Sequence, residues 1–220
     1  MSSSRAQLSF LCLPFLLAGP FPARAQQDVS RLEVERWNRV LTSPNPTFNT
    51  KPNEFLVEIA TSRKPGRALD IGMGQGRNAI WLAQQGWEVT GIDPAGEAVA
   101  LARRTAAKLG LKMNTQVTSV EDFDLGDQRW DLILLSYVSA RSVFDRLPRA
   151  LRPGGVLVLE AFHRDATRSG RIGGGVVYDS QELPKLFPKL RVLRYEEPIR
   201  QADFGLQTVR VVRYCGERPR

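Results

Sequence analysis

Short apolar runs alternate with helical segments from residue 67 onward, and this alternation constrains the fold more than any other feature. Asp131–Leu135 reads Asp-Leu-Ile-Leu-Leu, a continuous apolar run typical of a strand buried on both faces of a parallel sheet. Strands and helices in this order predict an α/β domain with right-handed crossovers. The predicted strands are residues 68–71, 87–93, 113–120, 131–135 and 156–162, and the predicted helices between them are residues 78–85, 97–109 and 143–151.

The segments on either side of this alternation follow other patterns. Residues 26–66 predict two helices, which we expect to form an approach segment or lid ahead of the main domain. Residues 67–220 are predicted to form one domain, because a chain of 220 residues is too short for two well-buried ones. The helices predicted outside the alternation are residues 28–41, 54–60 and 180–187, and an antiparallel pair of strands is predicted at residues 190–195 and 206–214.

Residues 1–25 have the layout of a secretory signal peptide. Arg5 supplies a positive charge, residues 8–18 are mainly apolar, and Ala23-Arg24-Ala25 has the small-x-small pattern of a cleavage site. The apolar run is too short for a permanent membrane span. We therefore expect an exported protein, periplasmic or secreted, and a cytoplasmic or membrane-associated protein is the alternative.

The formal net charge of +8 does not by itself indicate a nucleic-acid ligand. The basic residues are scattered in short groups, and no aromatic-basic RNA-binding motif accompanies them. No group of His and Cys residues has the spacing of a metal site, so no metal is expected. The partner that we expect is a small-molecule substrate.

A glycine-rich loop lies between the first predicted strand and the helix that follows it. Residues 69–78 read Leu-Asp-Ile-Gly-Met-Gly-Gln-Gly-Arg-Asn, with glycines where a backbone turns sharply and approaches a ligand. The spacing departs from the Gly-x-Gly-x-x-Gly pattern of dinucleotide sites, because Arg77 takes the last glycine position. Asp70 before the loop and Asp93 at the end of the second strand bracket a site suited to a positively charged nucleoside.

This loop and four further motifs resemble the class I S-adenosylmethionine-dependent methyltransferase family, over roughly residues 50–214. The Gly-Gln-Gly-Arg-Asn detail is similar to the tellurite-resistance and thiopurine branch of that family. The resemblance implies S-adenosyl-L-methionine as the cofactor. It also implies a three-layer Rossmann-like fold with a seven-stranded, mostly parallel sheet and an antiparallel C-terminal strand. The further motifs are Val-Thr-Gly-Ile-Asp (89–93), Glu-Asp-Phe (121–123), Asp-Leu-Ile-Leu-Leu-Ser-Tyr (131–137) and Leu-Arg-Pro-Gly-Gly (151–155).

The resemblance also implies roles for individual residues. Asp70 and the glycine backbone would hold the methionine part of the cofactor, and Asp93 would hold the ribose. Asp122 would accept from the adenine amino group and Phe123 would lie near the ring, with an ordinary turn residue and a core aromatic as the alternatives. The cofactor-binding residues implied are Asp70, Gly72, Gly74, Gly76, Arg77, Asn78, Asp93, Pro94, Glu121, Asp122, Phe123 and Ser136.

Methyl transfer from a sulfonium is an in-line displacement, so the protein mainly has to align donor and acceptor. A base is needed only if the acceptor must first lose a proton. Tyr137 and His163 are the candidate catalytic residues, and a solvated loop histidine is the alternative for His163. The predicted function is methyl transfer to a small molecule through a soft S, Se or Te atom or an O or N nucleophile. A non-catalytic exported protein that binds S-adenosylmethionine or a nucleoside is the alternative.

Overall fold

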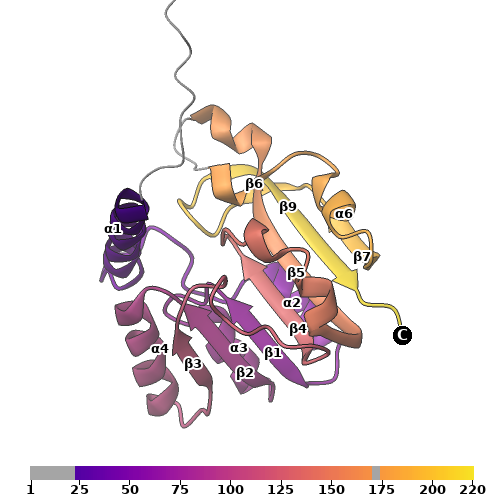
Figure 1. Ribbon diagram of the computed structural model, residues 1–220, viewed down its shortest axis with the longest axis horizontal. Coiled ribbons are helices and arrows are strands. Elements are labelled where there is room, and N and C mark those ends of the chain that lie inside the picture. Colours follow the sequence, from indigo (N-terminus) through magenta and orange to yellow (C-terminus); the bar gives the residue numbers. More distant parts are fainter. Residues whose placement is uncertain (1–22, 170–173) are drawn as a thin grey trace, which may run out of the picture.

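The computed structural model describes residues 23–169 and 174–220, and it confirms the predicted α/β fold (Figure 1). The strands are β1 (Arg67–Ile71), β2 (Glu88–Asp93), β3 (Asn114–Val117), β4 (Trp130–Ser136), β5 (Leu151–His163), β6 (Val177–Tyr178), β7 (Arg191–Glu196), β8 (Ile199–Gln201) and β9 (Thr208–Glu217). The α-helices are α1 (Ala23–Leu41), α2 (Glu54–Thr61), α3 (Arg77–Gln84), α4 (Gly96–Lys108), α5 (Leu147–Ala150) and α6 (Glu182–Leu186). Three 3₁₀ helices are η1 (Arg141–Val143), η2 (Arg164–Ser169) and η3 (Gly174–Val176).

The strands form one sheet whose main path has the order β3-β2-β1-β4-β5-β9-β7. The pairs from β3 to β5 are parallel, whereas β9 runs antiparallel to both of its neighbours, β5 and β7. This confirms the implied seven-stranded sheet with an antiparallel C-terminal strand. The short strands β6 and β8 pair with β5 and β9 and were not predicted.

Helices cover both faces of the sheet because alternate residues of the central strands point to opposite sides. Leu132 and Leu134 of β4 pack with α2, α3 and α4 in one hydrophobic core. Ile133 and Leu135 face the other way and pack in a second core with residues of η1, α5 and α6. The result is a three-layer arrangement, with α1 and α4 at one edge of the molecule and α6 at the opposite edge (Figure 1).

Three predicted elements differ clearly from the structure. The strand predicted over residues 156–162 extends over Leu151–His163 as β5. The helix predicted over residues 143–151 is broken into η1 and the four-residue α5. Pro148 explains the break, since proline has no amide hydrogen and cannot continue a helix that begins several residues earlier. The strand predicted over residues 113–120 is reduced to Asn114–Val117, which pairs only with β2 at the edge of the sheet.

The approach segment packs directly on the sheet domain. Asn53 caps α2, because its side-chain oxygen accepts a hydrogen bond from the Leu56 amide at 3.0 Å. Helix α1 lies beside α4, and the Asn38 side chain accepts a hydrogen bond from the Glu97 amide at 2.9 Å. Within the part of the chain that the structure covers, no helix is long and apolar enough to cross a membrane. The predicted signal peptide lies outside the described residues except for residues 23–25, which begin α1.

Candidate functional site

Two cavities lie side by side where β1, β2 and β4 end. The larger has a volume of about 620 Å³ and the smaller about 100 Å³, and both are lined by Gly72, Pro94, Val138 and Ser139. The strand order changes direction between β1 and β4. Ligands of open α/β sheets bind at the carboxyl ends of the strands at such a point. The two cavities therefore lie where the sequence predicts a ligand site.

The glycine-rich loop between β1 and α3 borders this site through Gly72, which lines both cavities, whereas Gly74 and Gly76 line neither. Gly72, Gly74 and Gly76 all have positive φ angles, of 71°, 55° and 84°, which other residues rarely adopt. A Cβ atom at Gly72 would lie 2.6 Å from Cγ2 of Val138, so only glycine lets the loop approach β4 this closely. The loop is fixed because the amides of Gly72 and Met73 both donate to the Ile92 carbonyl, at 2.9 and 3.0 Å.

Asp70 is a buried carboxylate without a hydrogen-bond partner among the described residues. Its side chain lies at the end of β1 with both oxygens out of contact with solvent. Burial raises the pKa of Asp70 to about 7, and the nearby Arg77 only partly offsets this effect. An unsatisfied buried carboxylate is costly and requires an explanation. Asp70 lines neither cavity, so a positively charged group beside the loop, such as the ammonium group of S-adenosylmethionine, would stabilise its ionised form through charge.

Asp93, at the end of β2, lines the larger cavity. Its Oδ2 accepts a hydrogen bond from the Gly74 amide at 2.9 Å, and its Oδ1 accepts from the Ala95 amide at 2.8 Å. Burial raises its pKa, and the two amides oppose the shift. A carboxylate has about four acceptor sites, so each oxygen can accept one further hydrogen bond. Asp93 therefore fits the predicted ribose contact while it also holds the glycine loop.

The residues predicted around the adenine separate into two groups. Pro94 and Glu121 line the smaller cavity. Asp122 is exposed, and its carboxylate accepts a hydrogen bond from Ser119 at 2.8 Å. Phe123 is buried in the hydrophobic core and is not among the residues that line either cavity. The structure thus favours a core role for Phe123.

Arg77 and Asn78, at the start of α3, hold the approach segment. The Arg77 side chain is only 6% exposed and pairs with Asp203 at 2.8 Å. It also donates to Ser136 Oγ at 3.1 Å, and of these residues only Ser136 lines the larger cavity. The Asn78 Oδ1 accepts from the Asn53 amide at 2.8 Å. Arg77 and Asn78, both predicted to contact the cofactor, line neither cavity and instead hold the residues around the site in place.

The two candidate catalytic residues lie in different places. Tyr137 lines the larger cavity in a left-handed conformation, with a φ of 56°. Its hydroxyl donates to Glu160 Oε1 at 3.0 Å, and burial raises its pKa well above the usual value. His163 lines neither cavity; its Nε2 lies 3.0 Å from Ser180 Oγ, and its Nδ1 accepts from the Asp165 amide. Only Tyr137 is brought to the site, and its hydroxyl is already bonded.

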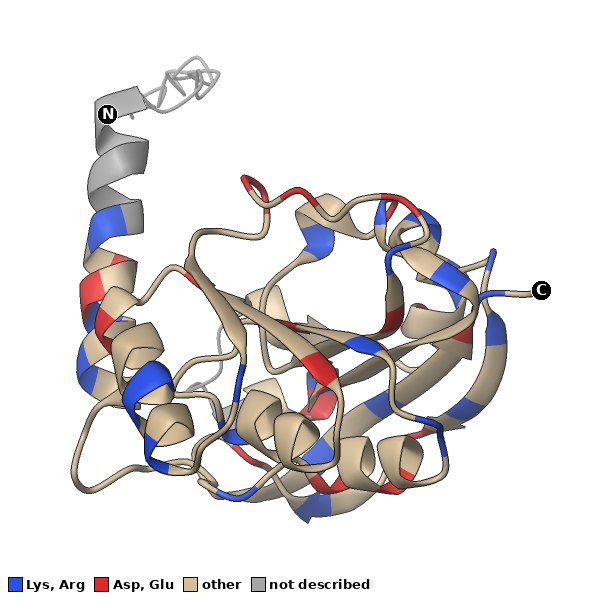
Figure 2. Cartoon of the chain, turned by 90° about the horizontal axis from the view of Figure 1, so that it is seen from below, with Lys and Arg blue, Asp and Glu red and all other residues tan. Residues whose placement is uncertain are grey.

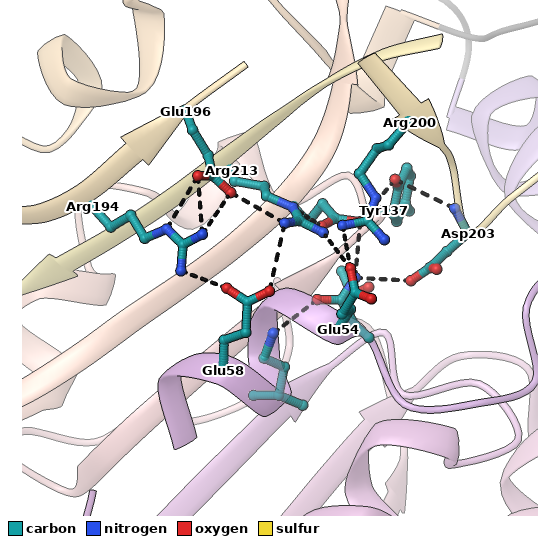
Figure 3. Close-up of polar contacts among 12 residues, drawn as sticks. Glu54, Glu58, Tyr137, Arg194, Glu196, Arg200, Asp203 and Arg213 are labelled. Atoms are coloured by element: carbon teal, nitrogen blue, oxygen red, sulfur yellow. Dashed lines mark hydrogen bonds and ion pairs between the residues drawn. The ribbon is translucent and has the colours of Figure 1, made fainter. Parts of the chain in front are cut away.

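A buried polar cluster beside the site was not predicted (Figure 3). Asp203, in the loop between β8 and β9, accepts from Asn49 and Asn53 at 2.9 and 2.8 Å in addition to its pair with Arg77. Glu160 of β5 accepts from Arg213 of β9 at 2.6 Å, and both are nearly fully buried. A charged residue with apolar neighbours on both sides in a strand, as at Glu160 and Arg213, is the sequence signal that indicates such a pair.

An aromatic group on the cavity wall was also missed. Trp37 of α1 and Phe204 of the β8–β9 loop both line the larger cavity, with ring centroids 6.0 Å apart. Phe204 also stacks on Phe48 at 5.3 Å. These residues are far apart in the sequence, so no local pattern indicates that they meet. Charged residues of both signs are interspersed over the chain (Figure 2), and in the described residues no group of His, Cys, Asp and Glu could hold a metal ion.

Comparison with known proteins places this site in a family. Residues 68–155 match the family model of a methyltransferase domain. The ubiquinone biosynthesis O-methyltransferase of Haemophilus ducreyi is 32% identical over 174 residues, which are 73% of this chain and 74% of that protein. The enzyme of the same name from Nitrobacter winogradskyi is 34% identical over 104 residues, 45% of this chain, and the chain spans only 40% of its length.

Solved structures show the same fold. The N-methyltransferase NodS of Bradyrhizobium japonicum, in complex with S-adenosyl-L-homocysteine, has a TM-score of 0.64 and 20% identity, covering 85% of this chain and 98% of its own. TehB of Haemophilus influenzae has a TM-score of 0.61 and 19% identity, covering 76% and 62%. At these identities the likeness concerns the fold, and the branch within the family stays a prediction. The chain belongs to the class I S-adenosylmethionine-dependent methyltransferases.

Proposed function

We propose that this methyltransferase acts on a small molecule bound in the 620 Å³ cavity. The observation that carries the proposal is that the two cavities adjoin, since Gly72, Pro94, Val138 and Ser139 line both of them. The smaller cavity suits the adenine, and the larger one lies within the volume range of small-molecule sites. Helix α1 closes one side of it through Trp37 and Leu41, which leaves room for a compact acceptor.

The chain's own residues bind and orient the cofactor. Asp93 would hold the ribose hydroxyls, Asp70 would stabilise the ammonium group, and the Gly72–Gly76 backbone would lie along the methionine part. When bound, S-adenosylmethionine supplies a methyl group that is already activated for transfer. Alignment of donor and acceptor is then the main contribution of the protein, and proximity alone lowers the barrier substantially.

No side chain on the cavity wall is well suited to remove a proton from the substrate that receives the methyl group. Of the ionisable side chains on it, Tyr137 has a strongly raised pKa and donates to Glu160. Asp93 accepts from two amides, and the hydrogen bond from Arg36 lowers the pKa of Glu33. The proposed acceptor atom is therefore one that reacts without such help, such as a soft thiolate, selenium or tellurium, or an O or N atom that is already unprotonated.

Calorimetric titration of the purified protein with S-adenosylmethionine, S-adenosylhomocysteine and NAD tests the cofactor site. We expect binding of the first two in the micromolar range and none of NAD. A screen for transfer of a radiolabelled methyl group would follow, beginning with thiols, selenite and tellurite and continuing with phenols and amines. Tight cofactor binding without transfer to any small molecule, but with transfer to proteins or RNA, would overturn the proposed acceptor class.

We also propose that residues 1–25 direct export, with cleavage after Ala25. Cleavage there would leave Gln26 near the start of α1 and would keep Trp37 and Leu41 on the cavity wall. Cell fractionation combined with N-terminal sequencing tests this. An intact N-terminus on protein from the cytoplasmic fraction would reject it, and a mature N-terminus at Gln26 would support it.

A further inference from the structure

Four aromatic rings from separate elements line the larger cavity. They are Trp37 of α1, Tyr137 at the end of β4, Phe162 of β5 and Phe204 of the β8–β9 loop. Tyr137 links the group, since its ring centroid lies 4.8 Å from that of Phe162 and 5.7 Å from that of Phe204. We refer to these four side chains as the aromatic wall. Such a concentration of rings around one cavity favours a ligand that presents flat apolar faces.

The aromatic wall is fixed before any ligand arrives. Phe204 follows Asp203, whose carboxylate binds Asn49, Asn53 and Arg77. The backbone on both sides is held as well: Asn49 donates to the Asp203 carbonyl at 2.7 Å, and Gly205 donates to the Thr47 carbonyl at 3.0 Å. A ring held in this way loses little freedom when a ligand packs on it. The wall is thus a preformed surface.

The charges on the cavity wall are already paired. Arg36 binds Glu33 through two hydrogen bonds, at 3.2 and 2.9 Å, and its guanidinium lies 4.3 Å from the centre of the Trp37 ring. Asp93 and Tyr137 are bonded as described above, and no other ionisable side chain of the described residues lines this cavity. The surface left for an acceptor therefore consists mainly of ring faces and aliphatic groups, such as those of Val138 and Val176.

We propose that the methyl acceptor is a planar aromatic compound and that Phe204 determines this specificity. The inference rests on the proposed function, in which the larger cavity receives the acceptor. A ring of the acceptor would pack against Phe204 and Tyr137, with the nucleophilic atom toward the glycine loop and the bound cofactor. Phe204 contacts the acceptor in this arrangement but takes no part in proton transfer.

The test measures the preference for an aromatic ring with the full-length protein saturated with S-adenosylhomocysteine. The probes are 2-naphthol and its saturated counterpart decahydro-2-naphthol, which carry the same hydroxyl on carbon skeletons of similar size. We expect the wild-type protein to bind 2-naphthol about tenfold more tightly, since several ring contacts contribute together. In Phe204→Ala the preference should fall to about threefold or less. Val176→Ala, which removes an aliphatic side chain from the same cavity, should retain it.

Each outcome separates the possible explanations. Equal binding of the two probes by the wild type, or an undiminished preference in Phe204→Ala, would overturn the proposal. If Phe204→Ala weakens binding of S-adenosylmethionine but not of S-adenosylhomocysteine, the wall serves the sulfonium cation and the proposal also fails. If the wild type binds no S-adenosylhomocysteine, it is the proposed cofactor site that fails. Phe204→Leu keeps most of the packing and replaces the alanine variant if that variant does not fold.

Discussion

Substitution of Asp203 by alanine should destabilise the protein more than any other single change in the β8–β9 loop. The carboxylate accepts hydrogen bonds from Asn49 and Asn53 and pairs with Arg77 at 2.8 Å, and the two charged side chains are each 6% exposed. Asp203→Ala removes all three bonds and leaves the buried guanidinium of Arg77 without its counter-charge.

The magnitude follows from the burial of the pair. Removal of one partner of a buried ion pair costs about 3–5 kcal/mol, because the other charge stays buried and uncompensated. Arg77 keeps its bonds to Ser136 Oγ and the Lys51 carbonyl, at 3.1 and 2.9 Å, which should place the loss toward the lower end. Asp203→Asn keeps the shape and one acceptor oxygen, so we expect it to lose less than the alanine variant.

Urea unfolding followed by circular dichroism measures the free energy of unfolding of the wild type and both variants. Asp127→Ala is the matched control, because it also removes an aspartate that pairs with an arginine at 2.9 Å, but on an exposed surface. Its unfolding midpoint should be unchanged within error. A loss below about 1 kcal/mol in Asp203→Ala would refute the argument that this pair anchors the loop.

Three further changes test the cofactor site. Asp70→Asn should stabilise the protein by about 1–4 kcal/mol at pH 8 in urea unfolding, and much less at pH 4. The buried Asp70 has a pKa of about 7, well above its ordinary value, so the folded protein favours the protonated carboxyl group. Its contribution to the free energy of unfolding is fully present below about pH 4 and is lost as the pH rises through 7. An equal effect of the substitution at both pH values would contradict this. Asp93→Ala should weaken S-adenosylhomocysteine binding by about 2 kcal/mol in calorimetry through loss of the ribose hydrogen bonds, and an unchanged dissociation constant would reject the role. Gly72→Val should abolish this binding, because its Cβ would lie 2.6 Å from Val138 and the φ of 71° disfavours valine; wild-type affinity would show that the cofactor does not lie along this loop.

The sequence predicted the sheet well because its signals are local. Residues 132–135 form a continuous apolar run, and Gly86 and Gly110 each follow the end of a helix. The strand β4 and the helices α3 and α4 could therefore be predicted from neighbouring residues alone. The glycine loop and Asp93 were predicted for the same reason, since each lies at the end of a recognisable strand. The helix predicted over residues 143–151 was wrong because Pro148 prevents the apolar spacing there from continuing as one helix.

The polar cluster and the aromatic wall could not be predicted in the same way. Asp203 and Arg77 are 126 residues apart in number, and nothing in the residues around either one indicates the other. Phe204 lies in a loop that looks polar from its sequence, yet the loop folds back on Thr47 and Asn49 and brings the ring to the cavity. Tertiary contacts of this kind depend on the completed sheet, and the sequence shows only the charged residues within apolar strands, such as Glu160.

The position of β9 has a consequence for the order of events during synthesis. β9 follows β7 in the chain but lies between β5 and β7 in the sheet, so β7 has no hydrogen-bonded neighbour on the main path until β9 is made. Arg213, the partner of Glu160, also arrives only with β9. A nascent chain that ends before residue 208 therefore has an open edge at β5, and Glu160 on that edge lacks its counter-ion, so we expect the chain to remain loosely folded. If residues 1–25 direct export as proposed, this delay would keep the growing chain in a state that a translocation channel accepts.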